Sequence, residues 1–342
     1  MRACVLVEPG RIETRDDVDL PVAGPTDVVV RVESALTCGT DLKAYRRGHH
    51  LMPPPTLFGH EFSGVVFDKG NKVDRYAIGQ PVMSVHTAPC GTCVYCVRSL
   101  QNLCPYLTKT MALGAYAEYL RVPGAVVDVN MYPKPDDLGY REAAMLEPLS
   151  CVTYCISQAL ATRPETAVVI GAGAIGLLHV MVLKEMGVGQ VIVSGRHTYR
   201  LETAKAVGAD LVIDSDSEHA TEAVLDATGG HGSPIVFECT GLPAVWEEAV
   251  TMVSRGGCVI LFGGCPGGTT VTYDTARLHY DQITLKGIFH FTPEAVRSAY
   301  DLLADGRLDV TPLITGDRTL EEVPQTFRTF RGKDTLKYAI IP

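Results

Sequence analysis

The sequence predicts an α/β protein with two parts, a β-rich part and a doubly wound parallel sheet flanked by helices. Up to about residue 150, short apolar runs alternate with Gly, Pro, Asn and Asp, and helical periodicity is scarce. From about Glu147, strand-like apolar runs alternate repeatedly with helical stretches, which is the pattern of a parallel sheet covered on both faces. The length of 342 residues suits two domains.

The individual elements follow from these patterns in chain order. Three regions of the first part read as strands and turns: VLVEPGRIETR, DVVVRVES and SGVVFDKGNKVDRYAIGQPVMSV. Six runs of the second part read as strands: TAVVIG, QVIVS, ADLVIDS, SPIVFECTG, GGCVILFGG and ITLKGIF. Most of these runs are separated by helical stretches: AIGLLHVMVLKEMG, YRLETAKAVG, HATEAVLDATG and PAVWEEAVTMVSRG. From about Phe289, a helix, FTPEAVRSAYDLLADG, and a final strand, LKYAIIP, complete the chain.

Composition excludes several classes of protein. A content of 46% hydrophobic and 20% charged residues excludes a disordered or fibrous chain. With 30 Lys and Arg against 39 Asp and Glu, the net charge of -9 predicts no binding to nucleic acid or to an anionic membrane. The longest apolar run, Ala167 to Leu183, contains three glycines and reads as strand, turn and helix. The N-terminus shows no signal-peptide pattern, so we expect a cytoplasmic protein.

A glycine-rich turn predicts a dinucleotide site. The turn runs from Gly171 to Gly176 and reads Gly-Ala-Gly-Ala-Ile-Gly. The residues expected to contact the cofactor are Gly171, Gly173, Ala174, Ile175 and Gly176. The turn follows a strand and precedes a helix, as the G-x-G-x-x-G motif requires. The three glycines permit the tight turn, the approach of a pyrophosphate and close packing of helix on strand. The helix N-terminus then offers unpaired N–H groups to the phosphates.

The end of the next strand indicates which dinucleotide binds. NAD sites carry an acidic residue about 20 residues beyond the glycines, where it binds the ribose 2′-hydroxyl. Here that position is Gly195, followed by Arg196, with Arg200 four residues further on. Both arginines can pair with a 2′-phosphate, so we expect NADP(H) to be favoured over NAD(H). The alternative is that both are solvated residues at the start of a helix.

Four cysteines close together in the sequence predict a metal site. Cys90, Cys93, Cys96 and Cys104 have the spacing C-x2-C-x2-C-x7-C. Four thiolates surround a tetrahedral Zn²⁺ completely, and such a site is structural. An iron–sulfur cluster is the alternative, since it also takes four cysteines.

A second group of metal-ligating residue types is dispersed along the chain. Cys38 and His60, with Glu61 and Glu147, are a plausible ligand set for a zinc ion that keeps a position for substrate. By spacing alone, a small buried cysteine and a core histidine are the alternative.

Taken together, the motifs resemble a known family. CGTD, GHEFSG, the four-cysteine lobe, EPLS, GAGAIG and ECTG occur in this order. The combination resembles the zinc-dependent medium-chain alcohol dehydrogenases, particularly their polyol (sorbitol) and threonine dehydrogenase branch, over essentially the whole chain. The resemblance implies a GroES-like catalytic domain at 1–150 and 288–342, with its structural zinc lobe at 88–106, and a Rossmann domain at 151–287. It also implies a homodimer or homotetramer.

The resemblance also implies roles for individual residues and two zinc ions per chain. Cys38, His60 and Glu147 would bind a catalytic zinc, and Glu61 would be a further ligand or would exchange with water. Asp41 would orient His60 through its other ring nitrogen. Thr40 would accept the proton of an alcohol. The expected reaction transfers hydride between NAD(P) and a secondary alcohol or ketone of a polyol, sugar or cyclitol.

The sequence departs from the family pattern at two positions, and two other functions remain as alternatives. Lys43 stands where many relatives have a histidine that relays the proton, and Gly195 stands where an acid is usual. An amino-alcohol dehydrogenase of the threonine type is an alternative enzyme, since the branch includes both. A non-catalytic NADP-binding protein is a third possibility, but such a protein would lack the metal ligands.

Overall fold

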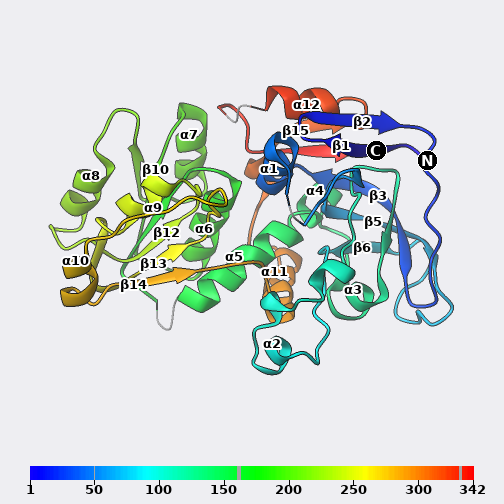
Figure 1. The fold of residues 1–342 in the computed structure, drawn as a ribbon, viewed down its shortest axis with the longest axis horizontal. Helices are drawn as coiled ribbons and strands as arrows, with labels where there is room; N and C mark the ends of the chain where they lie inside the picture. Colours follow the sequence, from blue (N-terminus) through cyan, green and yellow to red (C-terminus); the bar gives the residue numbers. More distant parts are fainter. Residues whose placement is uncertain (50, 160–162, 331–332) are drawn as a thin grey trace. The chain divides into compact units, whose positions relative to one another are not determined.

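The computed structural model describes residues 1–49, 51–159, 163–330 and 333–342, and the chain divides into two compact units (Figure 1). Unit 1 comprises Met1–Cys151, Phe291–Gly332 and Lys337–Pro342. Unit 2 comprises Val152–His290 and Lys333–Leu336. The short segment Lys333–Leu336 belongs to unit 2.

Unit 2 is built on a parallel six-stranded sheet with the order β11-β10-β9-β12-β13-β14. The strands are β9 (Thr166–Ile170), β10 (Gln190–Gly195), β11 (Leu211–Asp214), β12 (Ser233–Glu238), β13 (Val253–Leu261) and β14 (Thr284–Gly287). The predicted doubly wound sheet is confirmed. The strand order reverses at β9, so the carboxyl end of β9 lies at the position where such sheets bind ligands.

Helices cover this sheet. They are α6 (Ala174–Glu185), α7 (Thr198–Ala206), α8 (Ala220–Ala227), α9 (Pro243–Ala249) and α10 (Thr275–Tyr280). Helix α6 packs on β9 and β10, whereas α9 packs on β12 and β13. Because strand residues such as Val168 and Val236 are fully buried between helix and sheet, the strands read as continuous apolar runs.

Unit 1 contains two sheets. The smaller has the order β2-β1-β4, and the larger has the order β15-β16-β3-β5-β6-β8, with β7 also paired to β3. The strands of the smaller sheet are β1 (Ala3–Glu8), β2 (Arg11–Arg15) and β4 (Thr56–Leu57). Those of the larger sheet are β3 (Val28–Leu36), β5 (Glu61–Lys69), β6 (Pro81–Ser84), β7 (Tyr119–Val122), β8 (Met131–Pro133), β15 (Ile314–Thr319) and β16 (Lys337–Ile341).

The last strand of the chain lies in the middle of the larger sheet. β16 pairs with β15 in parallel and with β3 in antiparallel register, where Ala339 faces Leu36. On its other side β3 pairs with β5, and Leu36 faces Glu61. The end of β3 is therefore flanked by the start of β5 and the start of β16, from three distant parts of the sequence.

Helices and helical turns connect the strands of unit 1. They are α1 (Gly39–Arg47), α2 (Val94–Val97), α3 (Gly124–Val129), α4 (Tyr140–Ala143), α11 (Pro293–Ala304), α12 (Val323–Thr329), η1 (Gln101–Leu103), η2 (Leu107–Lys109) and η3 (Thr311–Leu313). Helix α5 (Leu146–Ala159) runs from unit 1 into unit 2. Periodicity did not indicate α1, because it is short and starts at Cys38, whose sulfur accepts the Thr40 N–H.

The apolar run from Ala167 to Leu183 forms β9, a turn and the first part of α6, as predicted. Within the described ranges, every helix is too short or too polar to traverse a lipid bilayer.

Candidate functional site

The four cysteines between 90 and 104 form one compact group. Their sulfur atoms lie within 4.8 Å of one another, and the Cys93–Cys96, Cys93–Cys104 and Cys90–Cys96 separations are 3.5, 3.8 and 4.0 Å. Sulfurs bound to one tetrahedral zinc at about 2.3 Å are about 3.8 Å apart. The backbone N–H of Thr92 helps lower the pKa of the Cys90 thiol to about 6, which favours a thiolate. The geometry therefore fits a zinc ion with no position open to substrate.

A second compact group joins Cys38, His60 and Glu61, with one ligand atom of each within 4.8 Å of the others. The pairing of β3 with β5 explains this proximity. Because Leu36 faces Glu61 in the register, Cys38, two residues beyond Leu36, lies beside the start of β5. The three residue types, one thiolate, one imidazole and one carboxylate, are zinc ligands.

Asp41 lies behind His60, as the resemblance implies. Its Oδ1 is 3.0 Å from Nδ1 of His60, and the Asp41 side chain is fully buried. Helix α1 places Asp41 one turn after Cys38. With Nδ1 3.0 Å from the Asp41 carboxylate, Nε2 of His60 is the nitrogen available to a metal.

Glu61 has a partner that the sequence analysis missed. The ammonium of Lys337 lies 2.7 and 2.5 Å from the two carboxylate oxygens of Glu61, and 2.9 Å from the carbonyl oxygen of Thr37. Both charged side chains are buried. The signal in the sequence was a lysine at the start of an otherwise apolar strand, LKYAIIP, but its partner lies 276 residues away.

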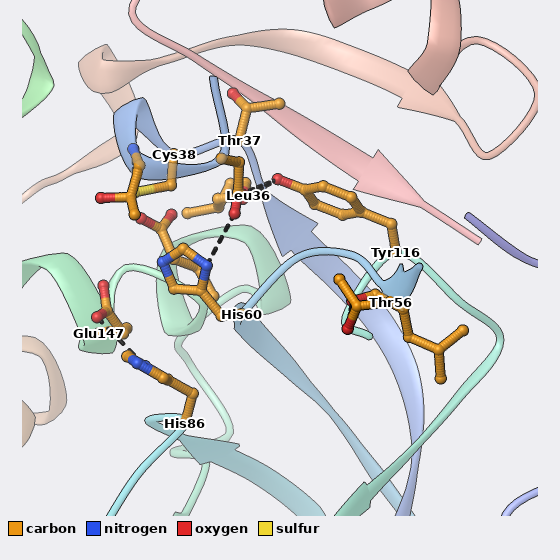
Figure 2. Close-up of polar contacts among 12 residues, drawn as sticks. Leu36, Thr37, Cys38, Thr56, His60, His86, Tyr116 and Glu147 are labelled. Atoms are coloured by element: carbon orange, nitrogen blue, oxygen red, sulfur yellow. Dashed lines mark hydrogen bonds and ion pairs between the residues drawn. The ribbon is translucent and has the colours of Figure 1, made fainter. Parts of the chain in front are cut away.

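Glu147 lies next to the group, in the first turn of α5. Its Oε1 is 3.3 Å from Nδ1 of His86, and the ring centroids of His86 and His60 are 4.9 Å apart (Figure 2). Burial raises the pKa of the Glu147 carboxyl to about 7. His86 was missed because a lone histidine before the cysteine lobe has no motif around it. His86 therefore lies between Glu147 and His60, and among the described residues the compact group of ligand atoms comprises Cys38, His60 and Glu61 without Glu147.

Thr40 and Lys43 lie on α1, which begins at Cys38. Both are partly buried, and the Thr40 N–H points at the Cys38 sulfur, 3.4 Å away. Residues three apart on a helix share one side of it. The two residues predicted to move the proton are thus on the helix that carries a predicted ligand at its N-cap.

The glycine-rich turn joins β9 to α6, and its geometry requires glycine. Gly171 has a φ of 107°, in the left-handed region. A Cβ on Gly176 would lie 1.9 Å from the carbonyl oxygen of Gly171, so the helix could not start so close to the strand. Near Gly173, the guanidinium of Arg200 lies 3.8 Å from such a Cβ. The N-terminus of α6, including Ala174 and Ile175, follows directly.

The residues predicted to select the cofactor lie at the end of β10 and the start of α7. Gly195 is buried, and Arg196 is exposed. Arg200 is half-buried, and its Nη2 donates to the carbonyl oxygen of Thr335 at 2.9 Å. Burial, together with the charge of Arg196, lowers the pKa of Arg200. Arg200 thus lies over the turn where a pyrophosphate would approach, whereas Arg196 faces solvent.

Two family models match the chain. The alcohol dehydrogenase GroES-like domain matches residues 24–134, and the zinc-binding dehydrogenase model matches residues 174–305. The first match covers the Cys38–His60–Glu61 group and the cysteine lobe, and the second begins in the glycine-rich turn.

Among curated proteins, the chain is 30% identical to an L-threonine 3-dehydrogenase of Bacillus velezensis, covering 100% of this chain and 99% of the relative. It is 28% identical to the sorbitol dehydrogenase of Bacillus subtilis, covering 100% and 97%.

Solved structures are similarly close. A chain of Sinorhizobium meliloti 1021 described as a zinc-binding dehydrogenase bound to NADP superimposes with a TM-score of 0.91 at 29% identity, covering 100% of this chain and 99% of that chain. The alcohol dehydrogenase RspB of Escherichia coli CFT073, complexed with NADH, superimposes with a TM-score of 0.87 at 26% identity, covering 100% and 99%. The chain therefore belongs to the zinc-binding alcohol dehydrogenase family and is an oxidoreductase.

Proposed function

We propose that this dehydrogenase transfers hydride between NADP(H) and a secondary alcohol or ketone of a polyol, sugar or cyclitol, with the help of a zinc ion held by unit 1. The observation that carries the proposal is the group Cys38, His60 and Glu61, with Asp41 behind His60. One thiolate, one imidazole and nearby carboxylates make a site that leaves a position open, which suits catalysis. Cys90, Cys93, Cys96 and Cys104 would hold a second zinc ion with a structural role.

The chain's own residues divide the work. Cys38, His60 and Glu147 would hold the zinc, and Glu61 would join them or remain on Lys337. When bound, the zinc supplies a Lewis acid that stabilises negative charge developing on the substrate oxygen. The Thr40 hydroxyl accepts the proton of the alcohol and passes it on. Lys43 occupies the relay position on the same helix.

The proposed preference for NADP(H) rests on Gly195 and Arg196, whereas Arg200 lies beside Gly173, where the pyrophosphate of either cofactor would approach. Gly195, at the end of β10, carries no side chain at the position where NAD sites have the acid that binds the ribose 2′-hydroxyl. A guanidinium matches a phosphate with paired, charge-assisted hydrogen bonds. The S. meliloti structure bound to NADP supports the proposal. The RspB structure was solved with NADH, so the structural neighbours differ in the cofactor they contain.

A threonine-type dehydrogenase is a second candidate. It is favoured by the similarity to the L-threonine 3-dehydrogenase of B. velezensis, which spans both chains almost completely. A substrate panel distinguishes the two candidates: polyols, inositols, sugar acids and amino alcohols are each assayed with NADP and with NAD, and nicotinamide reduction is followed by absorbance. Turnover of polyols or cyclitols supports the first candidate, and turnover confined to L-threonine and related amino alcohols supports the second.

The resemblance also supports a homodimer or homotetramer in solution. Light scattering coupled to size-exclusion chromatography tests this proposal, and a monomeric mass would contradict it.

A further inference from the structure

Tyr116 is a fully buried tyrosine whose hydroxyl points at the back of the candidate metal site (Figure 2). Its oxygen lies 2.5 Å from Oδ2 of Asp41 and 3.1 Å from the carbonyl oxygen of Leu36. A tyrosine hydroxyl has a single hydrogen to donate, and the charged carboxylate is the stronger acceptor. Burial raises the pKa of Tyr116 well above its usual range, so the hydroxyl keeps the hydrogen that it donates.

The ring of Tyr116 also contacts the residue that precedes His60. A Cβ built on Gly59 would lie 2.7 to 2.8 Å from three ring carbons, and Gly59 has a φ of 89°. The backbone N–H of Tyr116 donates to the carbonyl oxygen of Phe58 at 2.9 Å. One side of the tyrosine thus supports the chain that carries His60, while its hydroxyl holds Asp41.

Asp41 divides its two oxygens between two partners. Oδ2 accepts from Tyr116, and Oδ1 lies 3.0 Å from Nδ1 of His60. A carboxylate held at one oxygen loses rotational freedom about its terminal bond, so the other oxygen stays beside the imidazole nitrogen. Groups that hold a metal-binding histidine in this way influence metal affinity strongly.

We propose that Tyr116 is a positioning residue for the zinc ligand His60, acting through Asp41. The inference rests on the proposed zinc site, since it assigns a role toward an ion bound by His60. The competing role is purely structural: a buried hydroxyl that stabilises unit 1 by a hydrogen bond and has no effect on the metal.

Tyr116→Phe isolates the hydroxyl because the ring that packs on Gly59 remains. Tyr76→Phe is the matched control: Tyr76 is also buried in unit 1, and its hydroxyl donates to the carbonyl oxygen of Met131. Zinc release from the holoenzyme is followed with a chromogenic chelator. The two zinc ions are expected to leave in separate phases, and the phase that disappears in Cys38→Ala is assigned to the zinc bound with His60. Urea unfolding measures the stability of each variant.

We expect Tyr116→Phe to release that zinc about 10-fold faster than the unsubstituted protein, at the lower end of effects seen for such outer partners. Tyr76→Phe should lose similar stability with release unchanged within about twofold. In the cobalt-substituted enzyme, the ligand-field bands should shift for Tyr116→Phe alone. Unchanged release and spectra in Tyr116→Phe, or equal acceleration in Tyr76→Phe, would overturn the inference and leave the zinc site intact. If Cys38→Ala removes no release phase, the zinc proposal itself fails, and the inference with it.

A double-variant cycle tests whether the effect passes through Asp41. Asp41→Asn alone should also accelerate zinc release. The substitution replaces one of the two accepting carboxylate oxygens, which face Tyr116 and His60, by an amide nitrogen that donates. If Tyr116 acts through Asp41, adding Tyr116→Phe to Asp41→Asn should change release by less than about twofold, far from the product of the single effects. Fully multiplicative effects would show that Tyr116 reaches the metal by another route and would overturn the stated mechanism.

Discussion

Lys337 and Glu61 form a buried ion pair in which the ammonium contacts both carboxylate oxygens, at 2.7 and 2.5 Å, beside Cys38 and His60. The ammonium of Lys337 takes up part of the accepting capacity of the Glu61 carboxylate and so competes with a metal for it. The pair therefore decides whether Glu61 serves as a ligand, and it links the last strand of unit 1 to the candidate site.

Lys337→Met should destabilise the protein by about 3–5 kcal/mol, because it leaves the Glu61 carboxylate buried without its counter-charge. The double variant Glu61→Gln/Lys337→Met should recover much of that loss, since both charges are gone. Urea unfolding measures both, with Lys286→Met as the control for loss of a more exposed lysine that donates to Gln158. A loss below about 1 kcal/mol for Lys337→Met would show that the pair contributes little.

Cys38→Ala should remove about one zinc per chain and abolish turnover while the fold persists. Cys93→Ala should instead destabilise the lobe, because a structural zinc contributes directly to folding. Elemental analysis and circular dichroism measure the two effects. Cys258→Ala, a half-buried cysteine in unit 2, is the control and should keep two zinc ions. Normal activity of Cys38→Ala would rule out its role as a ligand.

Thr40→Ala should lower kcat by roughly 10²–10⁴-fold with little change in cofactor binding, since general acid–base steps are worth that much. Thr40→Ser keeps the hydroxyl and is the matched control, so it should retain most of the activity. The N–H that contacts the Cys38 sulfur belongs to the backbone and survives both changes. A drop of less than about threefold in Thr40→Ala would mean that another group takes the proton.

Arg196→Ala should raise the KM for NADP by about 10- to 150-fold and leave that for NAD almost unchanged, as expected for a lost charge-assisted hydrogen bond. Arg200→Ala should weaken both cofactors, because its guanidinium lies beside Gly173 in the phosphate-binding turn. Steady-state kinetics with both cofactors measure the split, with the exposed Arg255→Ala as control. A kcat/KM for NAD equal to or above that for NADP in the unsubstituted protein would overturn the NADP assignment.

Gly195→Asp should not convert the enzyme to NAD by itself. A Cβ at Gly195 would lie 2.7 Å from Cβ and 3.0 Å from N of Ala172, so the glycine-rich turn would have to shift. Overpacking of this kind costs about 1–3 kcal/mol. Adding Ala172→Gly removes one of these contacts and should restore part of the stability and shift the kcat/KM ratio towards NAD.

Gly287→Asp, at the end of β14 with no atom within 4 Å of its Cβ position, is the matched control for this change. Thermal unfolding should show a lower Tm for Gly195→Asp than for Gly287→Asp. Equal stability of the two variants would show that Ala172 moves aside for the new side chain at little cost in stability.

The secondary structure of unit 2 could be predicted from the sequence more completely than that of unit 1. In unit 2, the central strands β9 and β12 are mostly apolar and buried because helices cover both faces of a parallel sheet, so these strands could be predicted from their apolar runs. In unit 1, helix α1 could not be predicted from periodicity, since its nine residues start at a cysteine cap and carry little apolar pattern. Yet α1 holds Cys38, Thr40 and Asp41 together, which makes it central to the candidate site.

By itself, the sequence determined the features that depend on neighbouring residues: the alternation of strands and helices, the turn from Gly171 to Gly176, and the four-cysteine lobe. The residues of each of these features are close together in the chain, so they meet with little loss of loop-closure entropy. Their spacing in the sequence was therefore enough to predict the feature. Only the tertiary structure decided the partners of the buried polar groups, namely Lys337 for Glu61, His86 for Glu147 and Tyr116 for Asp41. The register of β3 with β5 and β16 brings distant segments together, and a buried charge must then be satisfied by whichever polar group that register places beside it.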